Sequence, residues 1–429
     1  MESDCRKRII ELIKREVIPA IGCTEPIAVA LCVAKAKEVL GEMPDRIEVY
    51  LSPNMLKNAM GVGIPSTDKT GLPIAIALGA IVGNSSYELE VLKDSTAIKV
   101  KEALDYMERC PIHVSIKKGN VNKLYIEVLV HSKQHSALAI IEESHTHFTR
   151  LEKNGQCIPI ESITSRMGAE SSSSSDLLDL NMRLVYDFAT TAPIEDIEFI
   201  LEAGRLNKAA AELSLSQDYG HALGRLLTSH KEVIGDNILS KTLSYTSAAC
   251  DARMAGAMVP VMSNSGSGNQ GISATLPVVV FAEERHSSQE ELIRALTLSH
   301  LTVIYIKQSL GRLSALCGCV VAATGSSCGI TYLMGGSYEQ VTYAVQNMIA
   351  NITGMICDGA KPSCSLKVTT GVSTALLSAM MAIENKCVTS TEGIIDRDVD
   401  KTIQNLTKIG SEGMAKTDEI VLDIMTSKC

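Results

Sequence analysis

Aromatic residues and positive charge are both scarce in this sequence. Among 429 residues there is no Trp, and Phe and Tyr contribute only 4 and 11. Base stacking needs aromatic platforms, so this composition argues against it. Lys and Arg number 40 against 49 Asp and Glu, a formal charge of −9, so the basic surface that phosphate backbones require is missing. We expect no nucleic-acid partner, and a core of Ala, Ile, Leu, Val and Met.

Long hydrophobic runs are also scarce. The apolar stretches at 72–82, 276–282 and 372–383 are shorter than the roughly 18 to 20 residues that span a bilayer. The charged N-terminal segment lacks the apolar block and small-residue cleavage site of a signal peptide. We therefore expect a cytoplasmic protein that contacts no membrane and whose thiols are reduced.

Cysteine is plentiful: there are 13, an odd number, and a reducing compartment argues against a disulfide framework. Five of them lie within 317–364, in the spacing C-x-C-x8-C followed by C-x6-C. This does not match the paired C-x2-C spacing of structural zinc sites. An iron–sulfur cluster assembled from separate loops fits better, and buried apolar thiols are the alternative.

The length predicts two or three domains, since a typical domain uses roughly 150 residues. Residues 1–44 predict two helices, broken near Pro19 and packed on the helical domain. Residues 45–166 predict an α+β domain, whose alternating segments at 113–118, 123–132, 136–144 and 147–153 indicate an antiparallel sheet. A Ser-rich run at 168–176 marks a junction, and 167–429 reads as a helical domain with loops converging on a site. The fold class is therefore α+β, predominantly helical.

Cys23 lies in the segment AIGCTEP, at or just before the start of the second helix. Pro26 suits the first turn of a helix, and Thr24 is a suitable N-cap. A helix N-terminus favours a thiolate, so we expect a lowered pKa at Cys23. The alternative is a buried thiol that packs the helix pair. Glu25 is explained equally well as a partner of Cys23 and as a first-turn acid that complements the helix dipole.

Two further polar segments are candidate binding sites. NSGSGNQG offers successive backbone N–H groups for an anion, with Gly266, Gly268 and Gly271 permitting the φ values of a concave nest, and helix capping is the alternative. A phosphate loop is not favoured, because G-x-x-x-x-G-K-[ST] is missing. Side-chain donors there are Ser265, Ser267 and Asn269. The segment 52–71 carries Asn54, Lys57, Asn58, Asp68, Lys69 and Thr70 around a Gly/Pro-rich loop.

His145 and His147 alternate on a probable strand edge in ESHTH. Two imidazoles on one face can bind zinc, but further ligands are not apparent. We expect strand-face histidines without a metal, with His145 as a secondary proton-transfer candidate.

Four segments carry a family resemblance: PAIGCTEPIAVA, NSGSGNQGISATLPVV, LCGCVVAATGSSCG and NMIANITGMICDGAKPSCSLKV. Together they resemble the bacterial and archaeal L-cysteine desulfidase family nearly end to end. The C-terminal half is more distantly similar to the α-region of iron–sulfur L-serine dehydratases, whose helical domain holds a [4Fe-4S] cluster.

The resemblance implies that Cys319, Cys357 and Cys364 hold such a cluster and leave one iron open. Cys317 and Cys328 compete with Cys319 for this role. The loop between the second and third cysteines is shorter than in the serine dehydratases. There, a C-terminal cysteine can cap the open iron, which implies the same use for Cys429.

The resemblance further implies a carbon–sulfur lyase that eliminates sulfide from L-cysteine to give pyruvate, ammonia and hydrogen sulfide. The open iron would act as a Lewis acid, while Cys23 and Glu25 move the α-proton. We expect the substrate-binding residues to come from the two polar segments described above: Asn54, Lys57, Asn58, Lys69, Ser265, Gly266, Ser267, Gly268 and Asn269. The alternatives are an L-serine dehydratase of the same mechanism and a cluster-based redox sensor. We expect a small amino acid as the substrate, and a homo-oligomer.

Overall fold

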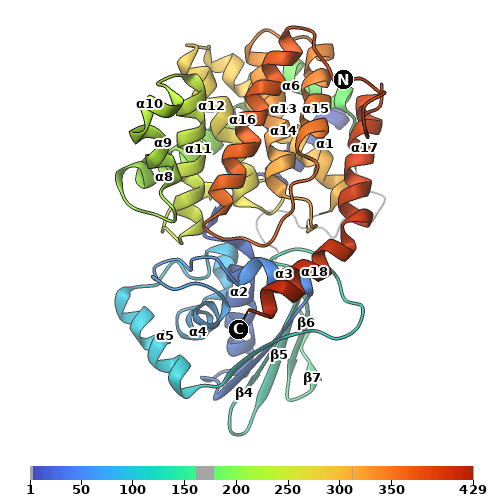
Figure 1. Cartoon of the computed structure of the whole chain (residues 1–429). Coiled ribbons are helices and arrows are strands. Elements are labelled where there is room, and N and C mark those ends of the chain that lie inside the picture. Colours follow the sequence, from blue (N-terminus) through green and yellow to red (C-terminus); the bar gives the residue numbers. More distant parts are fainter. Residues whose placement is uncertain (1–2, 161–177, 312, 429) are drawn as a thin grey trace.

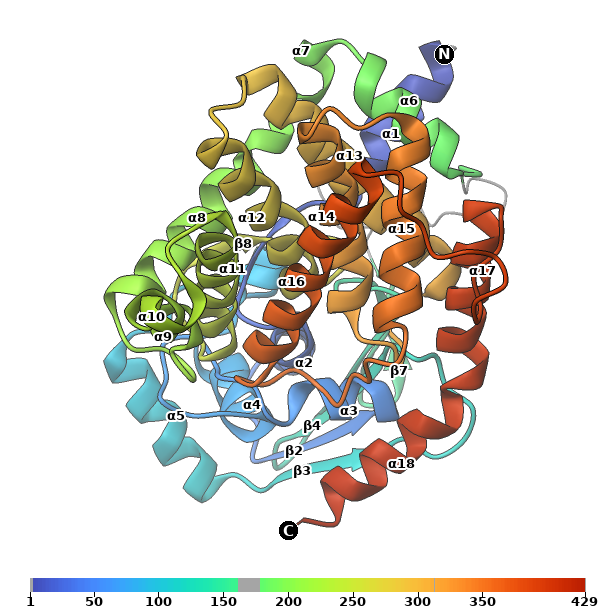
Figure 2. The same cartoon turned by 45° about the horizontal axis from the view of Figure 1, so that its top comes forward.

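The structure, a computed structural model, describes residues 3–160, 178–311 and 313–428. A large helical body lies above a smaller α+β unit in Figure 1, and Figure 2 shows the same two parts from a tilted direction. The predicted α+β class with a dominant helical part is confirmed.

The α+β unit contains a six-stranded mixed sheet in the order β3-β2-β4-β5-β6-β7. Its strands are β2 (Arg46–Leu51), β3 (Ile112–Ile116), β4 (Tyr125–His131), β5 (Ser136–Glu142), β6 (Phe148–Lys153) and β7 (Gln156–Cys157). β4, β5 and β6 pair antiparallel as predicted, but β2 lies between β3 and β4 and pairs in parallel with β3. The expectation of a simple meander is therefore wrong for β3. A parallel pair needs a long crossover, which the helices between β2 and β3 supply.

The second predicted helix belongs to this unit. Its helices are α2 (Thr24–Leu40), α3 (Pro53–Ala59), α4 (Leu72–Ile81), η1 (Ser85–Glu90) and α5 (Ala97–Arg109). α2 packs against α4, β4 and β5 and is buried on nearly all sides. Because a helix that is apolar all round must be covered from every direction, α2 lies inside the α+β unit. Our expectation that all of residues 1–44 pack on the helical domain is therefore corrected for α2.

The first helix joins the other core. The helical body contains α1 (Ser3–Glu16), α6 (Met182–Thr191), α7 (Ile194–Ile197), η2 (Glu198–Ile200), α8 (Leu201–Ser216), α9 (Leu223–Ser229), α10 (Lys231–Ile234), α11 (Ile238–Met254), α12 (Gly268–Glu284), α13 (Gln289–Leu310), α14 (Gly318–Leu333), α15 (Tyr338–Ile352), α16 (Cys364–Ile383), α17 (Val399–Lys408) and the π-helical turn η3 (Ile409–Gly413). The last helix, α18 (Ala415–Thr426), follows η3 and packs on α3 of the α+β unit. The apolar stripe of α1, with Ile9 and Ile13, enters the core of the helical body. A short antiparallel ladder between β1 (Pro19–Ile21) and β8 (Pro260–Met262) then ties the N-terminal segment to the body.

Small residues let the central helices approach closely. Gly325 and Gly329 of α14 face the carbonyl oxygens of Ser299 and Ala295 on α13, and a Cβ at these glycines would lie 2.4 and 2.8 Å from those oxygens. Larger side chains would separate the two helices, which explains how an aromatic-poor core reaches close packing.

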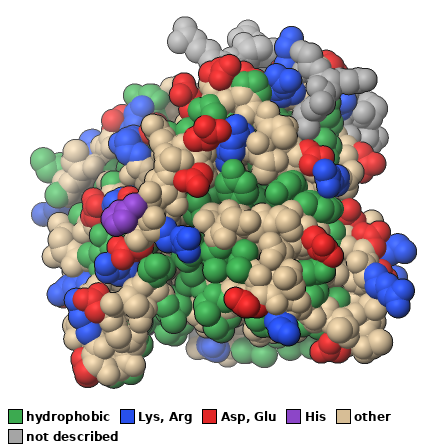
Figure 3. Space-filling view, turned by 90° about the horizontal axis from the view of Figure 1, so that it is seen from above, with side chains coloured by type: hydrophobic (Ala, Val, Ile, Leu, Met, Phe, Trp, Pro, Cys, Tyr) green, Lys and Arg blue, Asp and Glu red, His purple; other side chains and the backbone are tan. Residues whose placement is uncertain are grey.

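Of the helices in the described ranges, α16 alone is long and apolar enough to cross a membrane by length and composition. Half of its apolar window is buried inside the protein, where α11, α14 and α15 pack on it, and core helices pass the same test. The expectation that no apolar segment reaches this length is corrected for α16. Its outer side exposes Leu366, Leu377 and Met380 by 52 to 56%. Apolar side chains also gather between charged ones on the face of the body in Figure 3.

Candidate functional site

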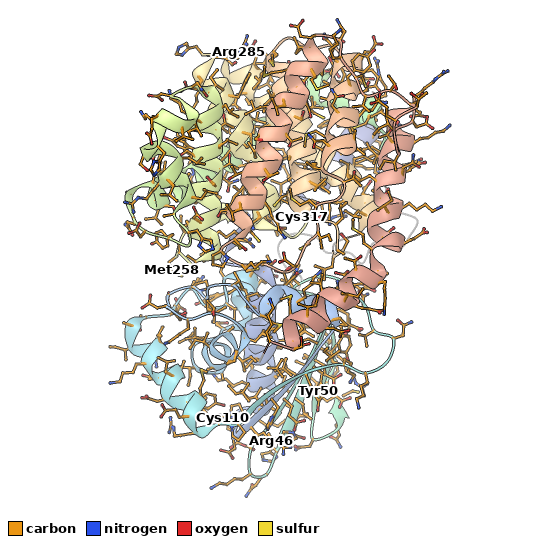
Figure 4. All side chains as sticks on the ribbon, viewed as in Figure 1. Arg46, Tyr50, Cys110, Met258, Arg285 and Cys317 are labelled. Atoms are coloured by element: carbon orange, nitrogen blue, oxygen red, sulfur yellow. The ribbon has the colours of Figure 1, made fainter. Side chains whose placement is uncertain are left out.

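A small third cluster of buried residues, separate from the two main cores, gathers six thiols. Cys23, Cys250, Cys317 and Cys319 belong to it, and Cys357 and Cys364 pack against it. Figure 4 shows Cys317 at the lower end of the helical body, facing the α+β unit. All twelve cysteines in the described part of the chain are free. Thiols that are distant in sequence therefore meet at the junction of the two parts.

Three helices begin at this thiol cluster. Cys23 immediately precedes α2, Cys317 precedes α14, and Cys364 is the first residue of α16. The first turn of a helix has unpaired N–H groups and a partial positive charge. The N-terminal ends of these three helices therefore favour anions such as thiolates or a carboxylate.

Backbone bonds hold two of the thiol segments together. Leu316 and Ile356 form an isolated antiparallel bridge, the N–H of Cys317 donates to the oxygen of Met355 (3.0 Å), and the N–H of Cys357 donates to that of Ala315 (2.7 Å). The segment before α14 and the loop after α15 are thus fixed side by side.

The two thiols of the C-x-C pair, Cys317 and Cys319, have pKa values that are shifted in opposite directions. A hydrogen bond from Cys319 lowers the pKa of Cys317 to about 7, and the same bond with burial raises the pKa of Cys319 well above its ordinary value. Burial raises the pKa of Cys357 to about 11, with the charge of Cys317 as the next cause. Cys317 is therefore the thiol of the pair that is more readily ionised. Cys328, the other competitor, packs in the main helical core, and burial raises its pKa to about 12.

The donor chemistry of these thiols fits an iron–sulfur cluster. Among the described residues, no group of three or more His, Cys, Asp or Glu is placed to hold a single metal ion. A cluster makes a different demand, because each thiolate binds its own iron and the sulfurs need not converge on one point. Cys357, Cys364 and the C-x-C pair offer the all-sulfur donors that such a group takes. The predicted fourth residue, Cys429, lies outside the described residues.

Cys23 and Glu25 form a buried pair beside the thiols. The Sγ of Cys23 donates to Oε2 of Glu25 across 3.0 Å, and Thr24 Oγ1 lies 3.0 Å from the same oxygen. Asn58 Nδ2 donates to Oε1 of Glu25, also at 3.0 Å. The carboxylate is therefore held at both oxygens and aimed at the thiol.

The protonation of this pair differs from our expectation for Cys23. Burial, followed by the charge of Glu25, raises the pKa of Cys23 well above its ordinary value. Burial by itself raises the pKa of Glu25. The charge of His145, the hydrogen bond from Cys23 and the charge of Arg253 together outweigh burial, and the pKa of Glu25 is lowered. The predicted lowering at Cys23 is thus corrected, because burial outweighs the helix N-terminus. The carboxylate, not the thiol, is the ionised member.

Arg253 and Cys250 were not anticipated from the sequence. Arg253 is buried on α11, where Nε donates to the oxygen of Gly22 (3.1 Å) and Nη1 to Oδ1 of Asn269 (3.0 Å). It thereby joins the segment before Cys23 to the start of α12. Cys250 lies one turn earlier on α11. The sequence signal that could have found them is the run Cys250-Asp251-Ala252-Arg253, which places a thiol and two charged side chains at the end of a helix whose other residues are mostly small or apolar.

The NSGSGNQG segment caps a helix more than it forms a nest. Ser267 is the N-cap of α12 and accepts from the N–H of Gln270 (3.5 Å). Of the three glycines, only Gly266 has a positive φ (80°), and Ser265 before it shares that conformation (49°). Gly268 instead packs on Arg253, and Gly271 packs on the backbone of Met262. The predicted role of Gly268 and Gly271 in a nest is therefore wrong. Thr24 Oγ1 donates to the oxygen of Gly266 (2.9 Å), which places the segment beside the Cys23 pair.

α3 delivers three of the predicted substrate-binding residues. Asn54, Lys57 and Asn58 are all buried; Asn58 holds Glu25, while the other two bond Asp418 of α18. Lys69 lies exposed in the following loop, with Asp68 and Thr70, so it is not brought into this buried group.

The two histidines of ESHTH lie in different environments. His145 is 5% exposed, and its charge acts on Glu25. His147 is exposed, and its Nδ1 lies 3.3 Å from the oxygen of Glu142. They do not form a shared zinc pair, and His145 alone belongs to the site.

Comparisons with known proteins place this chain in one family. The family model described as "Serine dehydratase alpha chain" matches residues 86–423, and the chain belongs to that family. More particularly, it is similar to proteins named UPF0597. One from Bacteroides fragilis is 67% identical over 99% of this chain and 98% of the relative, and one from Phocaeicola vulgatus is 64% identical over the same shares. One from Porphyromonas gingivalis is 55% identical over the whole of both chains.

Proposed function

We propose that this chain is a carbon–sulfur lyase that eliminates sulfide from L-cysteine, giving pyruvate, ammonia and hydrogen sulfide. The observation that carries the proposal is the junction of six thiols with the buried Cys23–Glu25 pair, in a chain of the serine dehydratase alpha chain family. That family is generally associated with iron–sulfur clusters, and its reaction is also a β-elimination from a small amino acid.

The cluster ligands in this proposal are Cys357, Cys364 and one thiol of the C-x-C pair. Cys319 was our prediction, but Cys317, with a pKa of about 7, is the more readily ionised thiol of the pair, and the proposal therefore takes Cys317 as the third ligand. When bound, a [4Fe-4S] cluster with an open iron would supply a Lewis acid for the leaving sulfur.

Side chains of the protein carry out the proton transfers in this proposal. Glu25 starts ionised and Cys23 starts protonated, so the pair carries one shared proton. Transfer of that proton to Glu25 frees the thiolate of Cys23 to take the α-proton of the substrate. The Cα–H electron pair then forms the Cα–Cβ double bond as the Cβ–S pair leaves with sulfur. Glu25 returns its proton to the leaving sulfide, which gives hydrogen sulfide and the enamine of pyruvate and leaves the pair with one proton again. Water then converts the enamine to pyruvate and ammonia.

The proposed substrate is a small amino acid. Its proposed binding residues are Asn54, Lys57 and Asn58, together with Ser265, Gly266, Ser267 and Asn269. The predictions of a homo-oligomer and a cytoplasmic location remain predictions. Light scattering on purified protein measures the first.

The proposal is tested by air-free purification with iron and acid-labile sulfide analysis, beside assays of pyruvate and sulfide from L-cysteine. We expect both elements in the protein and equal yields of the two products. Air-free protein without iron, or with iron but without turnover, would contradict the proposal. The second result would favour the cluster-based sensor.

L-serine dehydratase is the second candidate, since the family model bears that name. The same preparation assayed with L-serine separates the two. Pyruvate from L-serine at a higher kcat/KM than from L-cysteine would assign the chain to dehydration instead.

A further inference from the structure

A carboxylate of the chain itself occupies the predicted substrate-binding residues. Asp418, in the first turn of α18, places Oδ1 against the Nζ of Lys57 and accepts at Oδ2 from Asn54 Nδ2 (3.0 Å). The side chain of Lys57 is only 2% exposed and that of Asp418 is 16% exposed. Both carboxylate oxygens are thus engaged by α3, as those of a bound amino acid would be.

The carboxylate of Asp418 lies between the thiol loop that carries Cys357 and the Cys23–Glu25 pair. Lys57 Nζ also donates to the backbone oxygen of Cys357 (3.3 Å), and the next residue, Asn58, holds Glu25. A carboxylate on Lys57 is therefore beside the thiol loop and one residue along α3 from the group that aims the Cys23–Glu25 pair. Gly359 packs so closely on the backbone of Lys57 that a Cβ would lie 2.2 Å from the oxygen, which fixes α3 to this loop.

The helix that carries Asp418 is weakly attached. In α18 only Leu422 is buried, while Ile420 and Ile424 are 49 and 53% exposed. Figure 1 shows α18 leaving the helical body and lying across α3, and Figure 2 shows the same contact from another direction. The π-helical turn η3 precedes it, a geometry that is rare and less regular than the α-helix. Few apolar contacts resist the departure of this helix.

We propose that Lys57 and Asn54 form the subsite for the α-carboxylate of the substrate, and that Asp418 fills it until substrate displaces α18. The identity of the amino acid rests on the proposed function, but the exchange of carboxylates does not. A buried ammonium needs a paired anion, because an unpaired charge in the interior is strongly unfavourable. Exchange of Asp418 for a substrate carboxylate keeps Lys57 paired in both states.

Hydrogen–deuterium exchange on the full-length protein tests the displacement without turnover. L-Alanine carries the α-carboxylate but no leaving group, and its methyl ester lacks the carboxylate. L-Alanine should raise exchange in residues 415–426 by about tenfold, the shift expected when a minor open state becomes dominant. The methyl ester should leave it unchanged. Equal effects of the two compounds, or no effect of either, would overturn the proposal.

Variants separate a subsite from a purely structural clamp. Asp418→Asn should open α18 without any ligand and remove the response to L-alanine, whereas Asp423→Asn, on the same helix and exposed, should behave as the unaltered protein. If Asp418→Asn opens α18 but L-alanine does not do so in the unaltered protein, Asp418 is only a clamp and the proposal fails.

Kinetics provide a readout specific to the site. Asp418→Asn should lower KM for the amino acid by roughly five- to tenfold with kcat within about twofold, since the competing carboxylate is gone. An unchanged or raised KM would contradict the exchange. Opening of α18 by L-alanine in protein that shows no lyase activity would uphold the subsite and refute the reaction, so the two failures are distinguishable.

Discussion

The Sγ of Cys23 lies 3.0 Å from Oε2 of Glu25, and both side chains are buried where the α+β unit meets the helical body. Asn58, from the α+β unit, holds the second carboxylate oxygen, while Thr24 links the pair to Gly266 of the helical body. Contacts from both parts of the chain therefore hold the pair at their junction.

Replacement of Glu25 by Gln should remove the ionised acceptor while it keeps the shape of the side chain. We expect kcat for pyruvate formation to fall roughly 10²- to 10⁴-fold, the usual contribution of a positioned acid or base. Iron content and visible absorbance should stay at the level of the unaltered protein, because Glu25 is not among the proposed cluster ligands. Steady-state assays on air-free protein provide the measurement.

Cys32→Ala is the matched control for Cys23→Ala. Both thiols are buried on or beside α2, but Cys32 donates to the oxygen of Ala139 in the α+β core, away from Glu25. Cys23→Ala should lose turnover and Cys32→Ala should retain it. Equal activities in the two variants would show that Cys23 has no catalytic role.

The C-x-C pair can be resolved by single substitutions. Cys317→Ala should abolish the broad visible absorbance and most bound iron, because Cys317, with a pKa of about 7, is the proposed ligand of the pair. Cys319→Ala should retain most of the visible absorbance and most of the bound iron. Iron and acid-labile sulfide per chain, after air-free reconstitution, are measured for each.

Cys328→Ala controls for the loss of a buried thiol on α14, since Cys328 lies in the main helical core. It should keep its iron. The reverse pattern, with Cys319→Ala iron-free and Cys317→Ala fully loaded, would return the ligand to Cys319 as the family resemblance implied.

Gly271 on α12 is needed for close packing. A Cβ there would lie 1.9 Å from the carbonyl oxygen of Met262 in β8, so Gly271→Ala must push α12 away from the β1–β8 ladder. We expect the free energy of unfolding to fall by about 1–3 kcal/mol, the usual cost of overpacking. Urea denaturation measures it, and Gly354→Ala, with no atom within 4 Å of its added Cβ, should change little.

The sequence was sufficient for what depends on local pattern. The apolar stripe of α1, the start of α2 after Cys23 and the strands at β4 to β6 are local features, and the structure has them as predicted. The place of β2 between β3 and β4 was not predictable in this way, because strand order depends on how distant segments pack rather than on alternation within each one.

In the candidate site, too, the sequence predicts local features but not the contacts between distant segments. Residue types and motifs identified Cys23, Glu25, Lys57 and Asn58 and offered Glu25 as a partner of Cys23, but they did not give Asn58 as a partner of Glu25. Asp418 carries no local signal, since it is one acid among several on an exposed helix, and only folding brings it to Lys57. The sign of the pKa shift at Cys23 was also missed, because burial is a property of the assembled junction and not of the helix N-terminus alone.

His300 should make the protein less stable in acid. It is fully buried on α13, and burial lowers its pKa from 6.5 to about 3. Its neutral form suits its surroundings: Asn264 Nδ2 donates to Nδ1 (3.0 Å), while Nε2 lies 2.9 Å from Oγ1 of Thr275, whose own proton goes to the oxygen of Gly271. A second proton on Nδ1 would meet the N–H group of Asn264.

Because the pKa of His300 is lower in the folded state, the unfolded chain takes up this proton first as the pH falls. The contribution to stability is complete above pH 6.5 and is lost between about 6.5 and 3. Each pH unit below 6.5 costs about 1.4 kcal/mol, so at pH 5 the loss from this residue is about 2 kcal/mol. Urea midpoints measured from pH 7.5 to 5 should fall accordingly. His300→Gln, which cannot take up a proton, should flatten that dependence by the same amount, and parallel curves for the two proteins would show that His300 does not titrate as the buried neutral imidazole requires.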